Sequence, residues 1–354
     1  MPACVGLRFG VPLAISLAAC IRLLRISPAL AAAVLSMAMV SPAGHPPPPI
    51  RPVINHDFAD PAVLWAEGHY YAYSTMSRYG ATLLHVPLAR ADHLTGKWTV
   101  LGDAMPRLPG WVDTSSHGAG DVWAPDVSEQ DDEKYLLYFT ARSAAHKIQC
   151  IGAASARSPR GPFAGSGSQP LVCQPQGVHV DAIDPSAFTD TDGTRYLLYA
   201  SGLGRTAIWL QQLSSSGLRL VGRPRKLIEA DRSDEAHVVE APTLVHHGGH
   251  YVLFYSGSPF NSGKYFVNYS TARSLTGTFV KHKGQFLNKT SLNEAYQNPG
   301  GEDVVTAHRR DVLIFHAYTT ASQRSLFAVS LSWDGHDHPT LKLHGRAIVP
   351  RFAD

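Results

Sequence analysis

The sequence predicts an all-β protein, a five-bladed β-propeller. Five times along the chain an acidic residue, usually beside a proline, opens a segment that ends in an aromatic-rich strand. The prolines of the first four segments recur about every 60 residues, and a repeat of that length made of short strands is typical of propeller blades. Beyond residue 43 no window shows the 3.6-residue apolar period of an amphipathic helix. The five segments open at Asp60-Pro61, Pro125-Asp126, Asp184-Pro185, Glu240-Ala241-Pro242 and Glu302-Asp303.

Each segment is expected to end in a strand of about five residues, because aromatic and β-branched side chains favour the pleated backbone of a sheet. Two tight hairpin turns are expected between strands at Asp192-Gly193 and Gly248-Gly249, since these dipeptides adopt the required backbone angles. In chain order, the expected strands are residues 70–73, 135–138, 196–199, 251–255 and 312–315.

Three of the repeats have a second half, an apolar strand followed by a turn of the form Gly-x-aromatic. Glycine supplies the positive φ of such a turn, and the aromatic ring packs back onto the blade. These turns are Gly96-Lys97-Trp98, Gly161-Pro162-Phe163 and Gly277-Thr278-Phe279. One propeller over residues 55–354 accounts for the chain after its N-terminal part, and no second domain is indicated.

The first 43 residues resemble a signal peptide. The basic pair in Arg22-Leu23-Leu24-Arg25 precedes an apolar stretch at 29–40 that is shorter than the ~20 residues of a membrane span, and Ser41-Pro42-Ala43 offers a cleavage site. Residues 44–54 are expected to form a proline-rich linker, whose prolines disfavour the alternative of a buried N-terminal helix. We therefore expect secretion. Lipid anchoring at Cys20, within a lipobox-like Leu17-Ala18-Ala19-Cys20, is the alternative.

Two cysteines, Cys150 and Cys173, remain after removal of such a leader. An even count in an exported chain predicts a disulfide bond between them. Two buried free thiols are the alternative.

The charge balance argues against nucleic acid or anionic lipid as a partner. The chain has 31 Lys and Arg against 28 Asp and Glu, and the excess of three corresponds to Arg8, Arg22 and Arg25 in the leader. Binding to a polyanion needs clustered basic residues, and none are visible. The 18 histidines show no ligand spacing for a dedicated metal site. We expect a monomer without a membrane span.

The carboxylates that open the segments are candidates for catalysis. In a propeller the innermost strands line a central channel, so Asp60, Asp184 and Glu240, with Asp126 nearby, are expected to converge at one end of it. A carboxylate in an apolar setting is costly unless it is paired or used. Two carboxyl groups, one basic and one protonated, form the usual machinery for hydrolysing a glycosidic bond. The alternative is that these acids only cap turns before proline.

The motifs around these acids resemble those of glycoside hydrolase family 43, in the order of that family and over about residues 52–320. The resemblance implies a five-bladed propeller and an inverting enzyme acting on arabinose- and xylose-containing plant polysaccharides. It further implies Asp60 as general base, Glu240 as general acid, and Asp184 as the residue that tunes and orients the acid. The motifs are Asp60-Pro61 with Tyr70-Tyr71, Trp123-Ala124-Pro125-Asp126-Val127, Ile183-Asp184-Pro185-Ser186-Ala187-Phe188 with Asp192-Gly193, and Val239-Glu240-Ala241-Pro242-Thr243-Leu244.

The fifth blade departs from the family pattern. Many members have a Pro-Gly-His segment there, whose histidine helps to hold a metal ion, whereas this chain has Pro299-Gly300-Gly301. We therefore expect no cofactor, with a structural calcium ion as an open alternative. His316 is a second candidate for an axial histidine, or it is an ordinary strand residue.

Aromatic residues beside the acids are candidates for sugar binding, because a sugar ring stacks on a flat aromatic face. Phe58 and Trp123 are placed in this role, with core packing as the alternative for each, and Asp126 and His316 complete the expected substrate-binding set.

The sequence thus predicts a secreted inverting glycoside hydrolase. It is expected to cleave α-L-arabinofuranosyl linkages of an oligo- or polysaccharide such as arabinan or arabinoxylan. A β-xylosidase of the same family and a non-catalytic carbohydrate-binding propeller are the alternatives.

Overall fold

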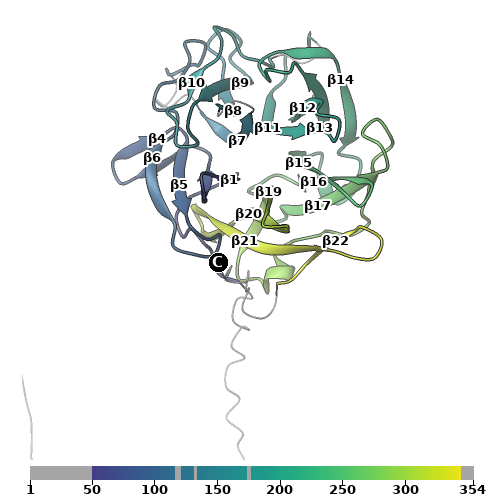
Figure 1. Ribbon diagram of the computed structural model, residues 1–354. Helices are drawn as coiled ribbons and strands as arrows, with labels where there is room; N and C mark the ends of the chain where they lie inside the picture. The colour runs from purple at the N-terminus through teal and green to yellow at the C-terminus, as the bar shows by residue number, and fades with distance from the viewer. Residues whose placement is uncertain (1–49, 116–120, 131–133, 174–176, 344–354) are drawn as a thin grey trace, which may run out of the picture. The chain divides into compact units, whose positions relative to one another are not determined.

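The computed structural model describes residues 50–115, 121–130, 134–173 and 177–343, and they form five antiparallel four-stranded sheets around a common centre (Figure 1). This arrangement confirms the five-bladed β-propeller. The part of the chain that the structure describes contains no α-helix, only short 3₁₀ helices such as Ser233–Glu235 and Thr290–Leu292. None of these is long and apolar enough to cross a membrane. The expected signal peptide and most of the expected linker lie outside the described residues.

Each blade contributes its first strand to the centre of the ring and its later strands to the outside (Figure 1). The first blade consists of β1 (Ala62–Ala66), β2 (His69–Tyr73), β5 (Pro87–Ala91) and β6 (Thr99–Asp103), with a hairpin of β3 (Ser77–Tyr79) and β4 (Thr82–Leu84) inserted. The second consists of β7 (Trp123–Gln130), β8 (Lys134–Arg142), β9 (Gln149–Ala156) and β10 (Ala164–Gly165). The third consists of β11 (Ala182–Thr189), β12 (Arg195–Ser201), β13 (Ala207–Leu213) and β14 (Leu220–Glu229). The fourth consists of β15 (Val239–His247), β16 (His250–Gly257), β17 (Phe266–Ala272) and β18 (Val280–Lys281), and the fifth of β19 (Gln297–Ala307), β20 (Arg310–Thr320), β21 (Gln323–Trp333) and β22 (Pro339–Leu341).

The aromatic-rich strands expected from the sequence all lie within the second strand of a blade, namely β2, β8, β12, β16 and β20. Each of these strands has a neighbouring strand on both edges. Tyr71, Tyr73, Tyr138, Tyr199 and Tyr255 are each at most 1% exposed. The repeat seen in the sequence therefore marks the core strand of each blade, and the acids precede it on the adjoining inner strand.

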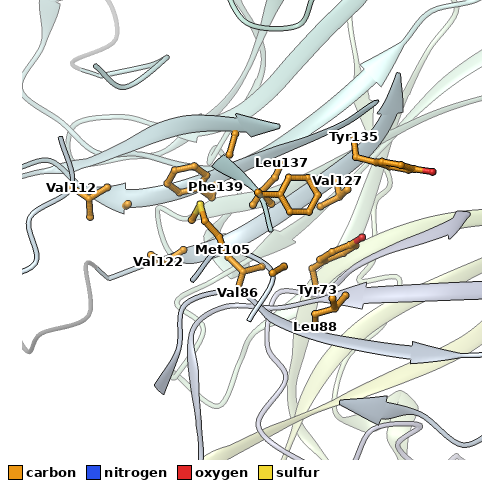
Figure 2. Packing of buried hydrophobic residues seen from close by; sticks show 14 of the residues in the cluster. Tyr73, Val86, Leu88, Met105, Val112, Val122, Val127, Tyr135, Leu137 and Phe139 are labelled. Atoms are coloured by element: carbon orange, nitrogen blue, oxygen red, sulfur yellow. The ribbon is translucent and has the colours of Figure 1, made fainter. Parts of the chain in front are cut away.

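Neighbouring blades pack through apolar side chains that fill the wedge between two sheets. Between the first and second blades, Tyr73 and Leu88 face Tyr135, Leu137 and Phe139 (Figure 2). Large aromatic side chains suit this wedge because each removes 150–250 Å² of surface, about 25 cal/mol per Å², from water.

The ring is closed by the N-terminal segment, which pairs with the last blade. The Val53 amide donates a hydrogen bond to the Leu326 carbonyl at 2.8 Å, and the Phe58 amide donates to the Arg324 carbonyl at 2.7 Å. Ile54 is only 6% exposed. Residues 50–54, expected as linker, are therefore packed on the fifth blade, and the propeller begins before residue 55.

A disulfide bond joins Cys150 in β9 to Cys173, as expected from the sequence. It links the third strand of the second blade to the segment that follows that blade, two strands away from the axis. Bridging residues separated by 23 positions restricts the unfolded chain.

Reduction of this bond is expected to lower the free energy of unfolding by about 3 kcal/mol in the chain-entropy model. Because the bond lies outside the channel, activity at mild temperature should hardly change. Melting curves with and without reductant measure the effect, and the Cys150→Ser/Cys173→Ser double variant serves as its matched control. An unchanged melting temperature in both would contradict a stabilising role.

Candidate active site

Every inner strand opens with the same unusual backbone, a left-handed residue directly before a proline. In four of the five blades, the pairing with the second strand also shifts at this point, as in a β-bulge. Residues other than glycine seldom adopt positive φ, and bulges re-aim side chains and recur beside active sites. The left-handed residues are Asp60 (φ 47°), Ala124 (φ 43°), Asp184 (φ 54°), Ala241 (φ 51°) and Asn298 (φ 50°).

The acids therefore do not all occupy equivalent positions, although the sequence suggested it. Asp60 and Asp184 are themselves left-handed residues, whereas Glu240 precedes one and Asp126 follows one by two positions. Two residues along a strand correspond to roughly 6–7 Å. The internal symmetry thus accounts for Asp60 and Asp184 but not for the other two.

Asp60 is held by groups from its own blade and from the fifth blade. Thr75 donates its hydroxyl to Asp60 Oδ2 at 2.5 Å, and Thr75 Oγ1 in turn accepts the Ala124 amide at 2.9 Å. Arg324 NH1 lies 3.5 Å from Asp60 Oδ2, and His316 Nδ1 lies 3.3 Å from Asp60 Oδ1. Because the Ala124 amide donates to Thr75 Oγ1, the hydroxyl proton is directed at Asp60, whose carboxylate is the natural acceptor.

These contacts favour the ionised form of Asp60. Burial alone would raise the pKa of Asp60, but the charge of Arg324, the charge of His316 when that ring is protonated, and the hydrogen bond from Thr75 together lower it below its usual value. Asp60 is therefore a carboxylate at neutral pH.

Glu240 experiences the opposite environment. Burial raises the pKa of Glu240 to about 7, the charge of Asp60 adds to this, and the hydrogen bond from Tyr265 and the charge of Arg324 act against it. The Tyr265 hydroxyl donates to Glu240 Oε1 at 2.8 Å and fixes its orientation. Two carboxyl groups whose environments separate their pKa values in this way are suited to act as base and acid.

Asp184 connects to Glu240 through the backbone. Asp184 Oδ2 accepts the amide of Ala241, the residue after Glu240, at 3.0 Å. Burial, Glu240 and Asp60 raise the pKa of Asp184 well above its usual range. Since an interaction between two titrating groups acts on both, Asp184 and Glu240 lose their protons as a coupled pair.

Replacing Asp184 by Asn is expected to lower the pKa of Glu240, because the carboxyl group coupled to it is gone. The alkaline limb of the kcat/KM profile, where Glu240 loses its proton, should move to lower pH by about one unit. Asp192→Asn, the same change at an exposed turn of the same blade, serves as the control. A profile that coincides with wild type would leave Asp184 with a turn-forming role only.

Two glycines of the fifth blade make room for these contacts. A Cβ on Gly300 would lie 2.0 Å from a ring carbon of Tyr265, and one on Gly301 would lie 2.6 Å from His316 Nδ1 and 2.7 Å from Asp60 Oδ1. Gly301 also has φ +58°. A side chain at this position would displace the Asp60–His316 contact, so the absence of histidine from this segment has a steric reason. The axial histidine is His316, which is the cross-strand partner of Gly300.

His316 contacts Asp60 and is fully buried, so its ring is placed against that carboxylate and not against a sugar. Its Nδ1 accepts the Asp60 amide at 3.1 Å, which leaves the proton of the neutral ring on Nε2. Burial lowers the pKa of His316 to about 4, against the charge of Asp60, and the charge of Arg324 adds to the lowering. The ring is neutral at physiological pH.

At the axis, His316 Nε2 is buried and has no hydrogen-bond partner among the described residues. Within the described ranges, no three His, Cys, Asp or Glu side chains are grouped to hold a metal ion. No step of the reaction proposed for this site is therefore routed through a metal.

Asp126 lies two positions further along its inner strand than the positions equivalent to Asp60 and Asp184. Its Oδ2 accepts the Ala187 amide of the next blade at 2.8 Å, as Asp303 Oδ2 accepts the Val63 amide at 2.8 Å across the ring closure. Both face a cavity of about 40 Å³ at the axis, which is large enough for water. Burial, together with Asp303, raises the pKa of Asp126 to about 7. Asp126 thus joins the second and third blades, and it lines this cavity together with Asp60 and Asp184.

The two aromatic candidates differ in their accessibility. Phe58 has no exposed surface and packs with Ile54, Ile314 and Leu326, so it cannot offer a face to a sugar. Phe58 is buried in the apolar cluster formed where the N-terminal segment packs on the fifth blade. Trp123 opens β7 and is half-buried beside Ala124, so it remains a candidate for sugar stacking.

Three further residues of the site had no signal in the sequence: Thr75, Tyr265 and Arg324. Arg324 lies in β21, Tyr265 directly precedes β17, and Thr75 lies two residues beyond the end of β2. The backbone of Arg324 pairs with both Tyr318 and Phe58, which fixes its guanidinium near Asp60.

The profile of glycosyl hydrolases family 43 matches residues 50–339. The chain belongs to glycoside hydrolase family 43. It is 28% identical over 232 residues to the extracellular endo-α-(1→5)-L-arabinanase 1 of Bacillus subtilis (strain 168). The aligned region covers 62% of this chain and 69% of that protein. It is 27% identical over 278 residues to a probable arabinan endo-1,5-α-L-arabinosidase A of Aspergillus flavus, with 73% and 81% covered. Among solved structures, a thermostable family-43 glycoside hydrolase superimposes with a TM-score of 0.68 at 24% identity, over 83% of this chain and 95% of that one.

The family 43 assignment confirms the resemblance seen in the motifs, and the structural likeness confirms the propeller. As a member of family 43, the chain is a glycoside hydrolase, and enzymes of this family bind polysaccharide substrates.

Proposed function

We propose that this family 43 enzyme is an exported, inverting hydrolase of α-L-arabinofuranosyl linkages in arabinan-type polysaccharides. The observation that carries the proposal is the electrostatic contrast between Asp60, whose pKa is lowered, and Glu240, whose pKa is raised to about 7. A binding module would not require that contrast.

In the proposed reaction, Asp60 takes a proton from a water molecule while the water oxygen forms a bond to the anomeric carbon. The glycosidic carbon–oxygen bond breaks, and Glu240 donates its proton to the departing oxygen. Direct attack by water inverts the anomeric configuration. Exchange with solvent then returns the proton to Glu240 and removes the one on Asp60.

Positioning residues support these roles. Arg324 and Thr75 keep Asp60 ionised, and Tyr265 holds the carboxyl group of Glu240 at 2.8 Å. Asp184 fixes the backbone next to Glu240. Positioned groups of this kind lower the barrier because they need no rearrangement during the reaction.

The choice of arabinofuranosyl linkages rests on the relatives, since the Bacillus subtilis and Aspergillus flavus proteins are both arabinan-degrading by name. Export is supported by the Cys150–Cys173 bond, because disulfides persist in oxidising compartments, and by the extracellular Bacillus subtilis relative. Cleavage near residue 43 and a monomeric enzyme are part of the same proposal.

The test is turnover of 4-nitrophenyl α-L-arabinofuranoside and β-D-xyloside, side by side, with debranched arabinan and xylan as polymers. The proposal expects preference for the arabinofuranosyl substrates. Preference for the xylosyl substrates would assign a β-xylosidase, and turnover of none of the four would favour a carbohydrate-binding propeller.

A further inference from the structure

An exposed aromatic side chain stands close to Arg324, which in turn contacts Asp60. Phe260 is 43% exposed and belongs to the loop between β16 and β17. That loop begins where β16 ends, and Ser256 near the end of β16 is the cross-strand partner of Glu240. Phe260 therefore lies at the same end of the propeller as the acids.

Phe260 is linked to the site through Arg324. The Arg324 guanidinium carbon lies 5.5 Å from the centre of the Phe260 ring, within the range of a cation–π contact. The same guanidinium lies 3.5 Å from Asp60 Oδ2. Its side chain is only 18% exposed, so one largely buried cation orients both the ring and the catalytic base.

A groove of about 310 Å³ adjoins this loop. Asn261, next to Phe260, lines it on the fourth blade, and Gln297, Asn298, Tyr318 and Thr319 line it on the fifth. Gln297 and Tyr318 are cross-strand partners at the beginning of β19, and Tyr318 pairs with Arg324 in β21. The groove therefore borders the start of β19 and the end of β20, beside the strand position of Arg324.

The chemistry of the groove fits a neutral sugar. All eight of its lining residues are uncharged, and amides, hydroxyls and a phenol among them offer both donors and acceptors. A sugar residue needs such groups for its hydroxyls and a flat apolar face for its C–H bonds. Phe260 supplies the face and the groove supplies the polar groups.

We propose that Phe260 and this groove form a subsite for a sugar residue of the substrate chain, beyond the residue whose linkage is cleaved. The subsite rests on the proposed function in one respect, that the sugar is an arabinofuranosyl unit. It implies that the enzyme binds a segment of several residues and favours oligomers over short substrates.

Binding of α-1,5-arabinohexaose and β-1,4-xylohexaose is measured by titration calorimetry in a Glu240→Gln background, which retains the groove. Phe260→Ala and Phe260→Leu should weaken arabinohexaose binding about tenfold, because the sugar loses the flat ring face on which it stacks. Phe260→Tyr keeps the flat face and should retain affinity within about twofold. Val280→Ala, at a residue that is 65% exposed on β18, is the matched surface control and should change nothing.

The outcomes separate the subsite from the substrate. Unchanged arabinohexaose affinity in both Phe260→Ala and Phe260→Leu overturns the subsite and leaves the proposed function in place. If only xylohexaose binds, and Phe260→Ala and Phe260→Leu weaken its binding about tenfold, the subsite is supported and the arabinofuranosyl assignment is overturned. Full affinity in Phe260→Leu but not in Phe260→Ala overturns stacking on a flat face. Failure of both hexaoses to bind overturns both proposals.

Discussion

Asp60→Asn is expected to leave the propeller folded and to reduce kcat by a factor of about 10²–10⁴, the usual contribution of a general base. Asparagine preserves the shape of the side chain and can still accept the hydrogen bond from Thr75. It cannot accept a proton from water. The measurement is kcat on debranched arabinan, with a thermal melt to verify folding.

The control for Asp60→Asn is Asp92→Asn, the same change at a surface carboxylate that pairs with His69 at 2.8 Å. This variant should retain wild-type kcat. Near-normal turnover by a folded Asp60→Asn protein would remove Asp60 from the role of base.

Glu240→Gln is expected to have an effect that depends on the leaving group. A sugar alkoxide needs protonation as it departs, whereas 4-nitrophenolate does not. We expect kcat on arabinan to fall by about 10²–10⁴ and kcat on the nitrophenyl arabinofuranoside to fall far less. Comparing both substrates in one preparation makes the ratio independent of the fraction of active enzyme.

Tyr265→Phe provides the matched control for Glu240→Gln, because it removes the hydrogen bond to Glu240 but leaves the acid in place. Its loss on arabinan should be smaller than that of Glu240→Gln, and the alkaline limb should move to higher pH since the bond from Tyr265 lowers the pKa of Glu240. Equal losses of Glu240→Gln on both substrates would exclude Glu240 as the proton donor.

The fold could be predicted because each blade repeats the same short pattern of neighbouring residues. Each core strand carries its own run of aromatic residues, and each inner strand opens with a residue before proline. The positions of Asp60 and Asp184 follow from the same repeat, since both are the left-handed residue of that opening. Glu240 was found by the motif that surrounds it, although it is displaced by one position from the repeat.

Contacts between distant segments could not be predicted in the same way. His316 meets Asp60 across 256 positions, and Tyr265 meets Glu240 across 25, and neither spacing has a local signature. Phe58 was misplaced because the closure of the ring, which buries it against the fifth blade, depends on pairing between the two ends of the domain. The contact of Asp126 with the next blade was missed because the sequence does not show the bulge at the start of β7.

The stereochemistry of the first product tests the proposed mechanism most directly. Proton NMR spectra recorded during the first minutes of arabino-oligosaccharide hydrolysis, before mutarotation, identify the anomer released. If Asp60 activates a water that attacks the anomeric carbon directly, the α-linkage yields the β-anomer first. Initial release of the α-anomer would mean that a carboxylate acts as the nucleophile, and the roles of Asp60 as general base and Glu240 as general acid in a single displacement would be wrong.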